Sequence, residues 1–112
     1  MLHRAKLLTF ILLFSFLSQH VQAYSYIAAR KIKAIGCHNT DSICFIEIEG
    51  EPVGPLNCRS TSIRWDSNTL AGKNQFTLLL SAYHANKALN IAISNDCFTM
   101  QPNFPTILFT NI

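Results

Sequence analysis

The stretch GKNQFTLLLSAYHANKALNIAISN, residues 72–95, decides the fold, because it holds a long helical pattern that runs directly into a strand pattern. Between Lys73 and Ala85, apolar residues recur three and four positions apart, which is the repeat of one helix face. These residues are Phe76, Leu79, Leu80 and Tyr83, and Leu78, Ala82 and Ala85 widen the face. The sequence therefore predicts a helix that is buried on most sides.

After this helix the apolar period changes to two, as in a half-buried strand. The alternation places Leu89, Ile91 and Ile93 against Asn90, Ala92 and Ser94. Asn86 suits a left-handed helix C-cap, and Lys87 suits the negative end of the helix. At the other end, the side chain of Thr69 or Asn68 is able to act as the N-cap by accepting a hydrogen bond from an exposed backbone amide of the first turn. The helix is expected to start within residues 70–73.

Strand patterns occupy most of the remaining chain after residue 25. The expected strands are residues 26–35, 43–49, 60–65, 89–94 and 106–112. In the first of them the alternation slips between Ala29 and Ile32, which indicates a bulge or an edge position. The order is β-β-β-α-β-β, so the sequence predicts an α+β domain of mostly antiparallel strands with one buried helix. The five-stranded OB barrel uses this order, and a small open sheet packed on the helix fits it as well.

Residues 1–23 have the layout of a secretory signal peptide. Basic residues open the chain, an apolar run covers residues 7–17, and a more polar segment ends in the small residue Ala23. The apolar run is shorter than the about 20 residues that span a bilayer, and an uncleaved anchor is the alternative. We expect cleavage after Ala23, which leaves one domain, residues 24–112, in the periplasm or the medium.

The basic excess of the whole chain belongs largely to the predicted signal peptide. Nine basic and six acidic residues give the chain a net charge of +3, but removal of Arg4 and Lys6 leaves seven and six, a net charge of +1. Arg30, Lys31 and Lys33 form a short basic cluster. We therefore expect no nucleic-acid partner and, after signal cleavage, no membrane span.

All four cysteines follow the predicted cleavage site, and an even number in a short exported chain is typical of disulfides. They are Cys37, Cys44, Cys58 and Cys97. Four cysteines allow three pairings, of which we prefer Cys37 with Cys44 across a polar turn and Cys58 with Cys97 around the helix and its following strand. A zinc site is the competing interpretation, but the sequence has no C-x-x-C pair, so we expect no metal and no other cofactor.

Several segments together resemble a group of small, uncharacterised exported proteins of Gram-negative bacteria. These segments are CF at 44–45, EGEPVGP at 49–55, IRWD at 63–66, AGK at 71–73, DCF at 96–98 and QPNFPT at 101–106. The resemblance covers nearly the whole predicted domain and supplies no active site. The predicted architecture is also similar to that of the receptor-binding B subunits of AB5 toxins, which are short exported chains with one helix and a disulfide-framed β fold. This similarity implies an oligomer.

Trp65, between Arg64 and Asp66, is the most suggestive cluster for binding. An indole beside a cation and a carboxylate is able to stack on a sugar or a base while its neighbours direct hydrogen bonds. The alternative is a buried Trp65 with Arg64 and Asp66 as a structural pair, and the usual burial of tryptophan favours it.

Three other groups invite a catalytic interpretation, and each has a plainer one. Ser81 and His84 lie three apart on the polar stripe of the helix, where a solvated edge is the ordinary explanation. His38 with Asp41 sits in the turn between two cysteines, where an exposed turn residue is the ordinary explanation. The third group is Glu47, Glu49 and Glu51, which alternate as on a solvated strand face.

No glycine-rich phosphate loop occurs either. We therefore expect a small exported binding module for a glycan or a protein surface, without chemistry of its own. A small secreted hydrolase, and a structural or inhibitory envelope protein, are the alternatives.

Overall fold

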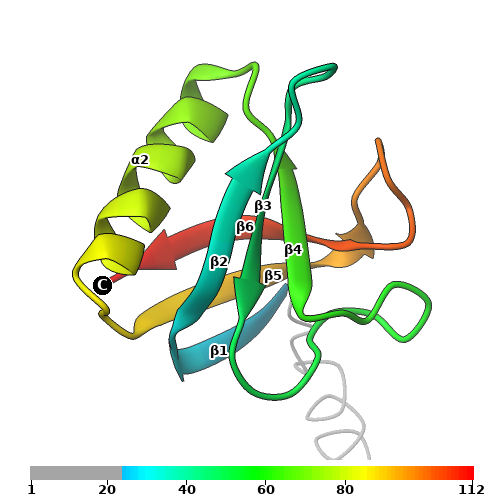
Figure 1. Ribbon diagram of the computed structural model, residues 1–112. Coiled ribbons are helices and arrows are strands. Elements are labelled where there is room, and N and C mark those ends of the chain that lie inside the picture. Colours follow the sequence, from blue (N-terminus) through cyan, green and yellow to red (C-terminus); the bar gives the residue numbers. More distant parts are fainter. Residues whose placement is uncertain (1–23) are drawn as a thin grey trace, which may run out of the picture.

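The computed structural model describes residues 24–112, so the predicted signal peptide, residues 1–23, lies outside the described part of the chain. The described part is α+β, in the order β-β-β-β-α-β-β (Figure 1). Its elements are β1 (Tyr24–Arg30), β2 (Ile32–Cys37), β3 (Ile43–Ile48), β4 (Ser62–Asp66), α2 (Leu70–His84), β5 (Leu89–Cys97) and β6 (Pro105–Asn111).

The six strands form one sheet in the order β1-β5-β6-β4-β3-β2, with every pair antiparallel except β4 and β6. The β4–β6 pair has a single register position, Arg64 opposite Thr106. On either side of it, β2, β3 and β4 run across the direction of β1, β5 and β6 (Figure 1). The outermost strands β1 and β2 do not pair with each other, so the sheet stays open. Of the two architectures left by the sequence, the open sheet is the one observed, and the closed barrel is not.

The prediction of a single strand over residues 26–35 is wrong, because β1 ends at Arg30 and β2 begins at Ile32 with a different partner. Ala29 has a φ of 55° and lies inside β1, at a register shift between Ile27 and Arg30, so the expected bulge is present there. Its amide donates to Oδ1 of Asn90 at 3.0 Å, outside the regular ladder. Up to Arg30 the chain pairs with β5, and from Ile32 it pairs with β3. The slip in the alternation therefore covers both the bulge at Ala29 and the change of partners at Lys31, which divides one stretch between both edges of the sheet.

Helix α2 begins and ends as the sequence predicts. The Thr69 hydroxyl accepts from the Gly72 amide at 2.9 Å, which confirms the N-cap. At the other end Asn86 has a φ of 52°, its amide donates to Tyr83, and the Lys87 amide donates to Ala82. These two bonds are the pair that defines a Schellman motif.

The expectation that this helix is buried on most sides is wrong. Of its residues, only Gly72, Leu79 and Ala82 are buried, while Leu70 and Tyr83 are exposed. The helix lies along the outside of the molecule and contacts β2 with one face, so its other faces meet solvent (Figure 1). The apolar face predicted from the sequence is therefore broader than the part of the helix surface that is buried.

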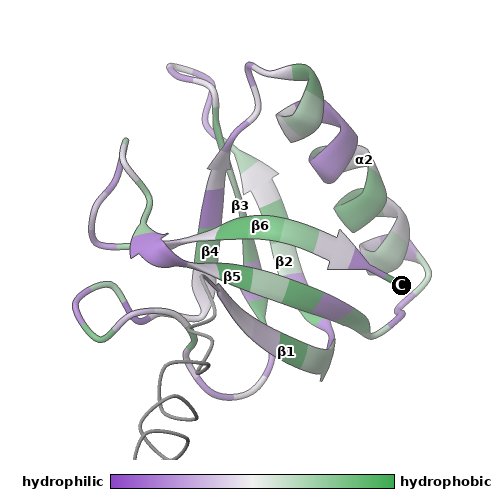
Figure 2. Cartoon of the chain, turned by 180° about the vertical axis from the view of Figure 1, so that it is seen from behind, coloured by the Kyte–Doolittle hydropathy of each residue, from purple (hydrophilic) through white to green (hydrophobic). Residues whose placement is uncertain are grey.

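The core lies between the two halves of the sheet and α2 (Figure 2). Its most deeply buried side chains are Ile46, Ile63, Leu79, Leu89, Ile91 and Ile93. The apolar face predicted for residues 89–94 is confirmed by this set, which also contains Ile46 of β3. Ala92 is buried as well, because the register places it between Tyr26 of β1 and Phe109 of β6 on the outer face.

The predicted last strand is present, but it does not alternate regularly: a regular strand would place Ile107 and Phe109 on one face, and here they lie on opposite faces. Ile107 lies opposite Ile93 and Phe109 lies opposite Ala92, which point to opposite faces of β5. Leu108 is the extra residue of a bulge between these pairs, and an extra residue reverses the faces that follow it.

Both preferred disulfides are present, Cys37–Cys44 and Cys58–Cys97. The first joins opposite residues of the β2–β3 hairpin. The second joins the loop after β3 to the end of β5, across a separation of 39 residues. Two disulfides fit an oxidising compartment outside the cytoplasm.

Candidate functional site

A row of four residues crosses the outer face of the sheet from β2 to β6. The register aligns Gly36 with Phe45, Phe45 with Arg64, and Arg64 with Thr106. A side-chain carbon at Gly36 would lie 2.9 Å from the Phe45 ring, so the absence of a side chain there lets the ring lie over β2. This arrangement holds Phe45 beside Arg64.

Arg64 is enclosed by aromatic rings and hydrogen-bond partners from three parts of the chain. Its guanidinium carbon lies 3.8 Å from the ring centroid of Phe104 and 5.1 Å from that of Phe45. Its Nη1 donates to Oε1 of Gln101 at 2.8 Å and to Nε2 of His38 at 3.4 Å. We call His38, Phe45, Arg64, Gln101 and Phe104 the Arg64 cluster.

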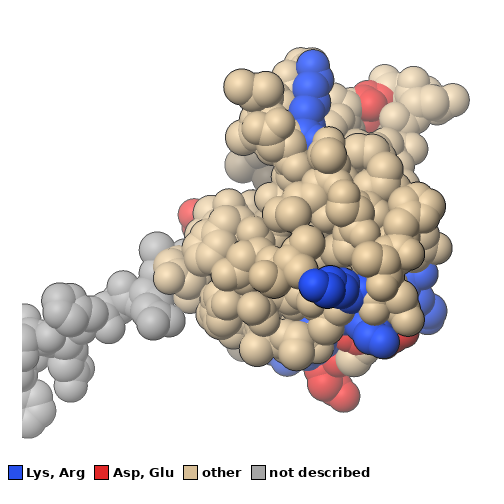
Figure 3. Space-filling view, turned by 90° about the vertical axis from the view of Figure 1, so that its left-hand side faces the viewer, with Lys and Arg blue, Asp and Glu red and all other residues tan. Residues whose placement is uncertain are grey.

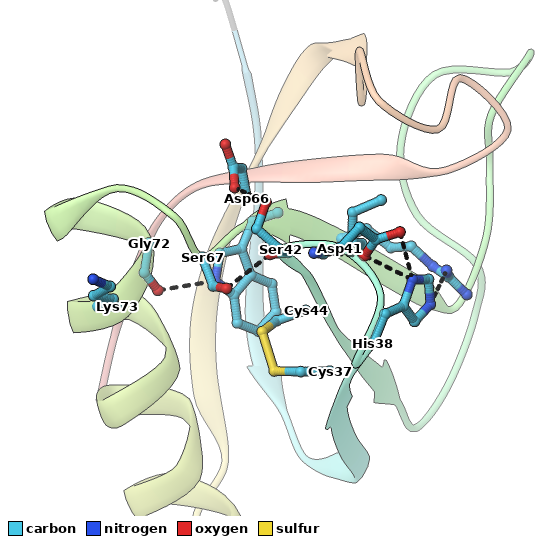
Figure 4. Close-up of a disulfide and its surroundings, with 12 residues drawn as sticks. Cys37, His38, Asp41, Ser42, Cys44, Asp66, Ser67, Gly72 and Lys73 are labelled. Carbon is cyan, nitrogen blue, oxygen red and sulfur yellow. Dashed lines mark hydrogen bonds and ion pairs between the residues drawn. A yellow bond between two sulfur atoms is a disulfide. The ribbon is translucent and has the colours of Figure 1, made fainter.

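The contact with Arg64 determines which ring nitrogen of His38 accepts a hydrogen bond. Because Nη1 of Arg64 is a donor, the facing Nε2 of His38 must accept, and the imidazole proton is on Nδ1. Nδ1 lies 3.0 and 3.2 Å from the two carboxylate oxygens of Asp41 and donates to them. Figure 4 shows the two side chains facing each other beside the Cys37–Cys44 disulfide.

Asp41 is held in its ionised form by the same turn. The Ile43 amide donates to its carboxylate at 2.9 Å, and this bond is the main reason that the pKa of Asp41 lies below its ordinary value. The His38 contact lowers that pKa further. A charged Asp41 orients His38, which in turn holds Nη1 of Arg64.

The segment from Phe98 to Phe104 is a hydrogen-bonded loop that carries the other half of the cluster. Its backbone bonds run from Phe98 to Phe104, from Gln101 to Phe98 and from Phe104 to Gln101. Phe98 is 4% exposed and follows the disulfide at Cys97, so the loop is anchored where it leaves β5. Gln101 and Phe104 are therefore held in place against Arg64.

The three residues predicted as a binding site lie in different environments. Trp65 is 5% exposed, and its Nε1 donates to the Gly72 carbonyl at 3.0 Å, so the indole belongs to the core. Asp66 accepts from the Ser42 hydroxyl and from the Asn68 amide, and these bonds lower its pKa. Of the three, only Arg64 belongs to the cluster.

Trp65 and Asp66 instead line an open cleft of about 380 Å³ between the first turns of α2 and strand β6. Gln75 of the helix borders it and donates to the Thr110 hydroxyl at 2.6 Å. Asp96 contributes a second carboxylate. The cleft is thus acidic, whereas the cationic Arg64 is held by a separate set of contacts.

Of the other candidates, Ser81, His84 and Glu47 lie apart from the Arg64 cluster, whereas His38 belongs to it. Ser81 and His84 are exposed on α2, where the His84 ring lies 5.8 Å from that of Tyr83. Glu47 accepts from the Thr61 hydroxyl at 3.2 Å. His38 has Asp41 on one nitrogen and Arg64 on the other, so neither nitrogen faces a nucleophile in this arrangement.

Within residues 24–112, no three His, Cys, Asp or Glu side chains gather as they would around a metal ion. No helix of the same segment is long and apolar enough to cross a membrane. Seen from the side of α2, the surface is mostly uncharged, with Lys and Arg side chains in separate places (Figure 3).

The chain was compared with family models, with curated proteins and with solved structures, and none of them matches it.

Proposed function

We propose that the mature chain is a secreted or periplasmic binding module that holds a glycan at the Arg64 cluster and carries out no chemistry of its own. The observation that carries this proposal is the cluster itself, two rings and a planar cation held together by side chains from β3, β4, the β2–β3 turn and the loop 98–104. Rings supply the apolar area for a sugar, and the amide and cation supply directed hydrogen bonds.

The position of the cluster supports the same function. If β1 and β2 are counted as two halves of one bent strand, β3 and β4 are the second and third strands, and the loop 98–104 joins the fourth and fifth. OB folds bind oligosaccharides and oligonucleotides on the face of strands two and three and on the adjoining loops. This part of the argument is an analogy of fold. The near-neutral charge of the mature chain favours a glycan over a nucleic acid.

The cluster is also accessible and already ordered. The side chains of His38 and Asp41 are 31% and 39% exposed, and Phe45, Arg64, Gln101 and Phe104 are half-buried. The bonds that hold these groups exist before a ligand arrives, so little side-chain freedom is lost on binding. A hydrolase is less well supported, because His38 is fully engaged.

Screening on a printed array of neutral, amino and acidic oligosaccharides tests the proposal. The oxidised protein is compared with Arg64→Ala, with Gln101→Ala, which removes only the loop's hydrogen bond, and with Arg59→Ala, an exposed arginine outside the cluster. We expect binding that both cluster variants weaken at least about tenfold, equivalent to about 1.4 kcal/mol, and that Arg59→Ala leaves unchanged.

Absence of binding to every printed glycan would contradict the proposal, and so would equal binding by Gln101→Ala. In the first case a pull-down of a single protein from the cell envelope would favour the structural or inhibitory alternative.

A further inference from the structure

The two free edges of the sheet differ in how they are protected. Strand β2 contains the exposed Lys33 and follows the exposed Lys31. Helix α2 packs against this strand. Lysines and a covering helix are ordinary means of keeping an edge strand from pairing with another chain. Strand β1 is the outermost strand of its layer (Figure 2) and has neither over residues 24–28, whose sequence YSYIA has no charged side chain and no proline.

Within residues 24–112, no strand pairs with the outer edge of β1. Residues 24–27 pair with β5 in continuous register, which satisfies one side of the strand. Among the described residues, the backbone hydrogen bonds outside the ladders include none from β1. A hollow of about 240 Å³ lies beside this strand, lined by Ser25 and Ile27, by the segment from Glu51 to Gly54, and by the charged side chains of Arg30 and Arg59. The edge therefore has no partner strand within the described residues and has space beside it.

The outer face next to this edge is aromatic and uncharged. The Phe109 ring lies 5.6 Å from that of Tyr24 and 6.5 Å from that of Tyr26. Tyr26 is 49% exposed and Phe109 42%. The Tyr26 hydroxyl donates to Oδ1 of Asn111 at 3.4 Å, so the polar groups of this face are neutral as well.

We infer that β1 pairs antiparallel with β1 of a second copy of this chain, joining two sheets across a two-fold axis at Tyr26. In that register Tyr26 faces its own copy, which an uncharged ring tolerates and a charged residue would not. Tyr24 lies opposite Ala28 of the second copy, and Ser25 lies opposite Ile27, so a larger side chain meets a smaller one on either side of the axis. The edge is thus self-complementary, as a two-fold interface requires.

The same strand sets the length of the pairing. Nη1 of Arg30 donates to the carbonyls of Glu49 and Glu51, at 2.8 and 3.0 Å, and β1 has a bulge at Ala29. The β3–β4 loop therefore closes the far end of the edge, and the paired segment is limited to residues 24–28. The two Arg64 clusters of such a dimer lie in the other layers of the two sheets, where the interface does not cover them.

Sedimentation equilibrium of the oxidised protein tests this inference, with Tyr26→Lys and the matched control Tyr83→Lys. Tyr83 is 40% exposed on α2 and has no place in the interface. We expect a dimer for the wild type and for Tyr83→Lys, and at least about a tenfold weaker dimer for Tyr26→Lys, because two lysines would face each other in a low-dielectric interface.

A wild-type monomer at high concentration would overturn the inference, and so would a closed ring of five copies or a dimer that Tyr26→Lys leaves intact. Circular dichroism of both variants separates loss of pairing from loss of folding. A second variant, Ala28→Lys, carries the same charge at an already exposed position and is expected to dissociate the dimer as well. None of these results depends on glycan binding.

Discussion

Gly72 is the residue at which helix α2 comes closest to the end of β4. A side-chain carbon there would lie 1.9 Å from the Asp66 carbonyl oxygen, a backbone atom that has no freedom to rotate away. The Gly72 carbonyl also accepts from the buried indole of Trp65. The glycine therefore permits the close contact that seats the first turn of the helix.

For Gly72→Ala, two effects oppose each other. Alanine favours the helix by about 1 kcal/mol, whereas overpacking against backbone costs about 1–3 kcal/mol or more. We expect a net loss of about 2 kcal/mol in the free energy of unfolding, measured by urea denaturation. Ala71→Gly at the exposed neighbour is the control and should cost about 1 kcal/mol from propensity alone. A more stable Gly72→Ala would show that the helix start can move.

Asp66 makes stability depend on pH. Its pKa in the fold lies below the ordinary value of 3.8, first because Ser42 donates to it and then because the Asn68 amide does. A group of this kind stabilises the fold when ionised, so its contribution is complete above its unfolded pKa and is lost as the pH falls through its folded pKa. We expect the melting temperature of Asp66→Asn to fall less steeply than that of the wild type below pH 3.8.

Thermal unfolding followed from about pH 6 down to about pH 2 measures this difference. Glu49→Gln, at an exposed acidic residue, is the control for removing one negative charge. If the two variants flatten the profile equally, the effect comes from net charge and not from the bonds of Asp66.

Single residues show why the site could be predicted only in part. The sequence groups Arg64 with Trp65 and Asp66, but alternation along β4 turns Arg64 away from Trp65. The residue that Arg64 contacts is Phe45, which by alternation shares a strand face with Glu47, so the sequence pattern is compatible with this contact. Gln101, 37 residues further along the chain, was not, because no local pattern specifies which loop folds over a strand.

Among the elements, the disulfides differ in the length of chain that they close. Cys58–Cys97 spans 39 residues and Cys37–Cys44 spans 7. On the chain-entropy model the longer loop stabilises by about 4 kcal/mol and the shorter by about 2.5 kcal/mol. We therefore expect Cys58→Ala with Cys97→Ala to cost more free energy of unfolding than Cys37→Ala with Cys44→Ala. Urea denaturation at neutral pH compares the two pairs, and the reverse order would mean that native packing outweighs loop length.

The positions of the helix and strands were more predictable than the breaks and bulges in the strands. Period and capping residues located α2 to within a few residues, and alternation located β3. The division between β1 and β2 at Lys31 has no glycine, proline or asparagine to indicate it, and the bulge at Ala29 has a conformation that is more typical of glycine or asparagine. The bulge at Leu108 is likewise set by pairing with β5 and not by the residues around it.

For the whole molecule, the two proposed interactions lie on different layers of the sheet. The layer of β2, β3 and β4 carries the Arg64 cluster, and the layer of β1, β5 and β6 carries the uncharged edge. A dimer through that edge presents two clusters, so weak individual sites would reinforce each other on a surface that displays many glycans.

The location of binding is measured by a ¹H–¹⁵N NMR titration of the oxidised protein with pooled neutral, amino and acidic oligosaccharides. Binding at the Arg64 cluster shifts the Arg64 Nε–H, the Gln101 side-chain amide and the backbone amides of His38, Phe45 and Phe104, and Gln101→Ala reduces these shifts. Shifts confined to the acidic cleft beside Asp66 and Gln75, or a spectrum that no sugar changes, would contradict a glycan site at Arg64.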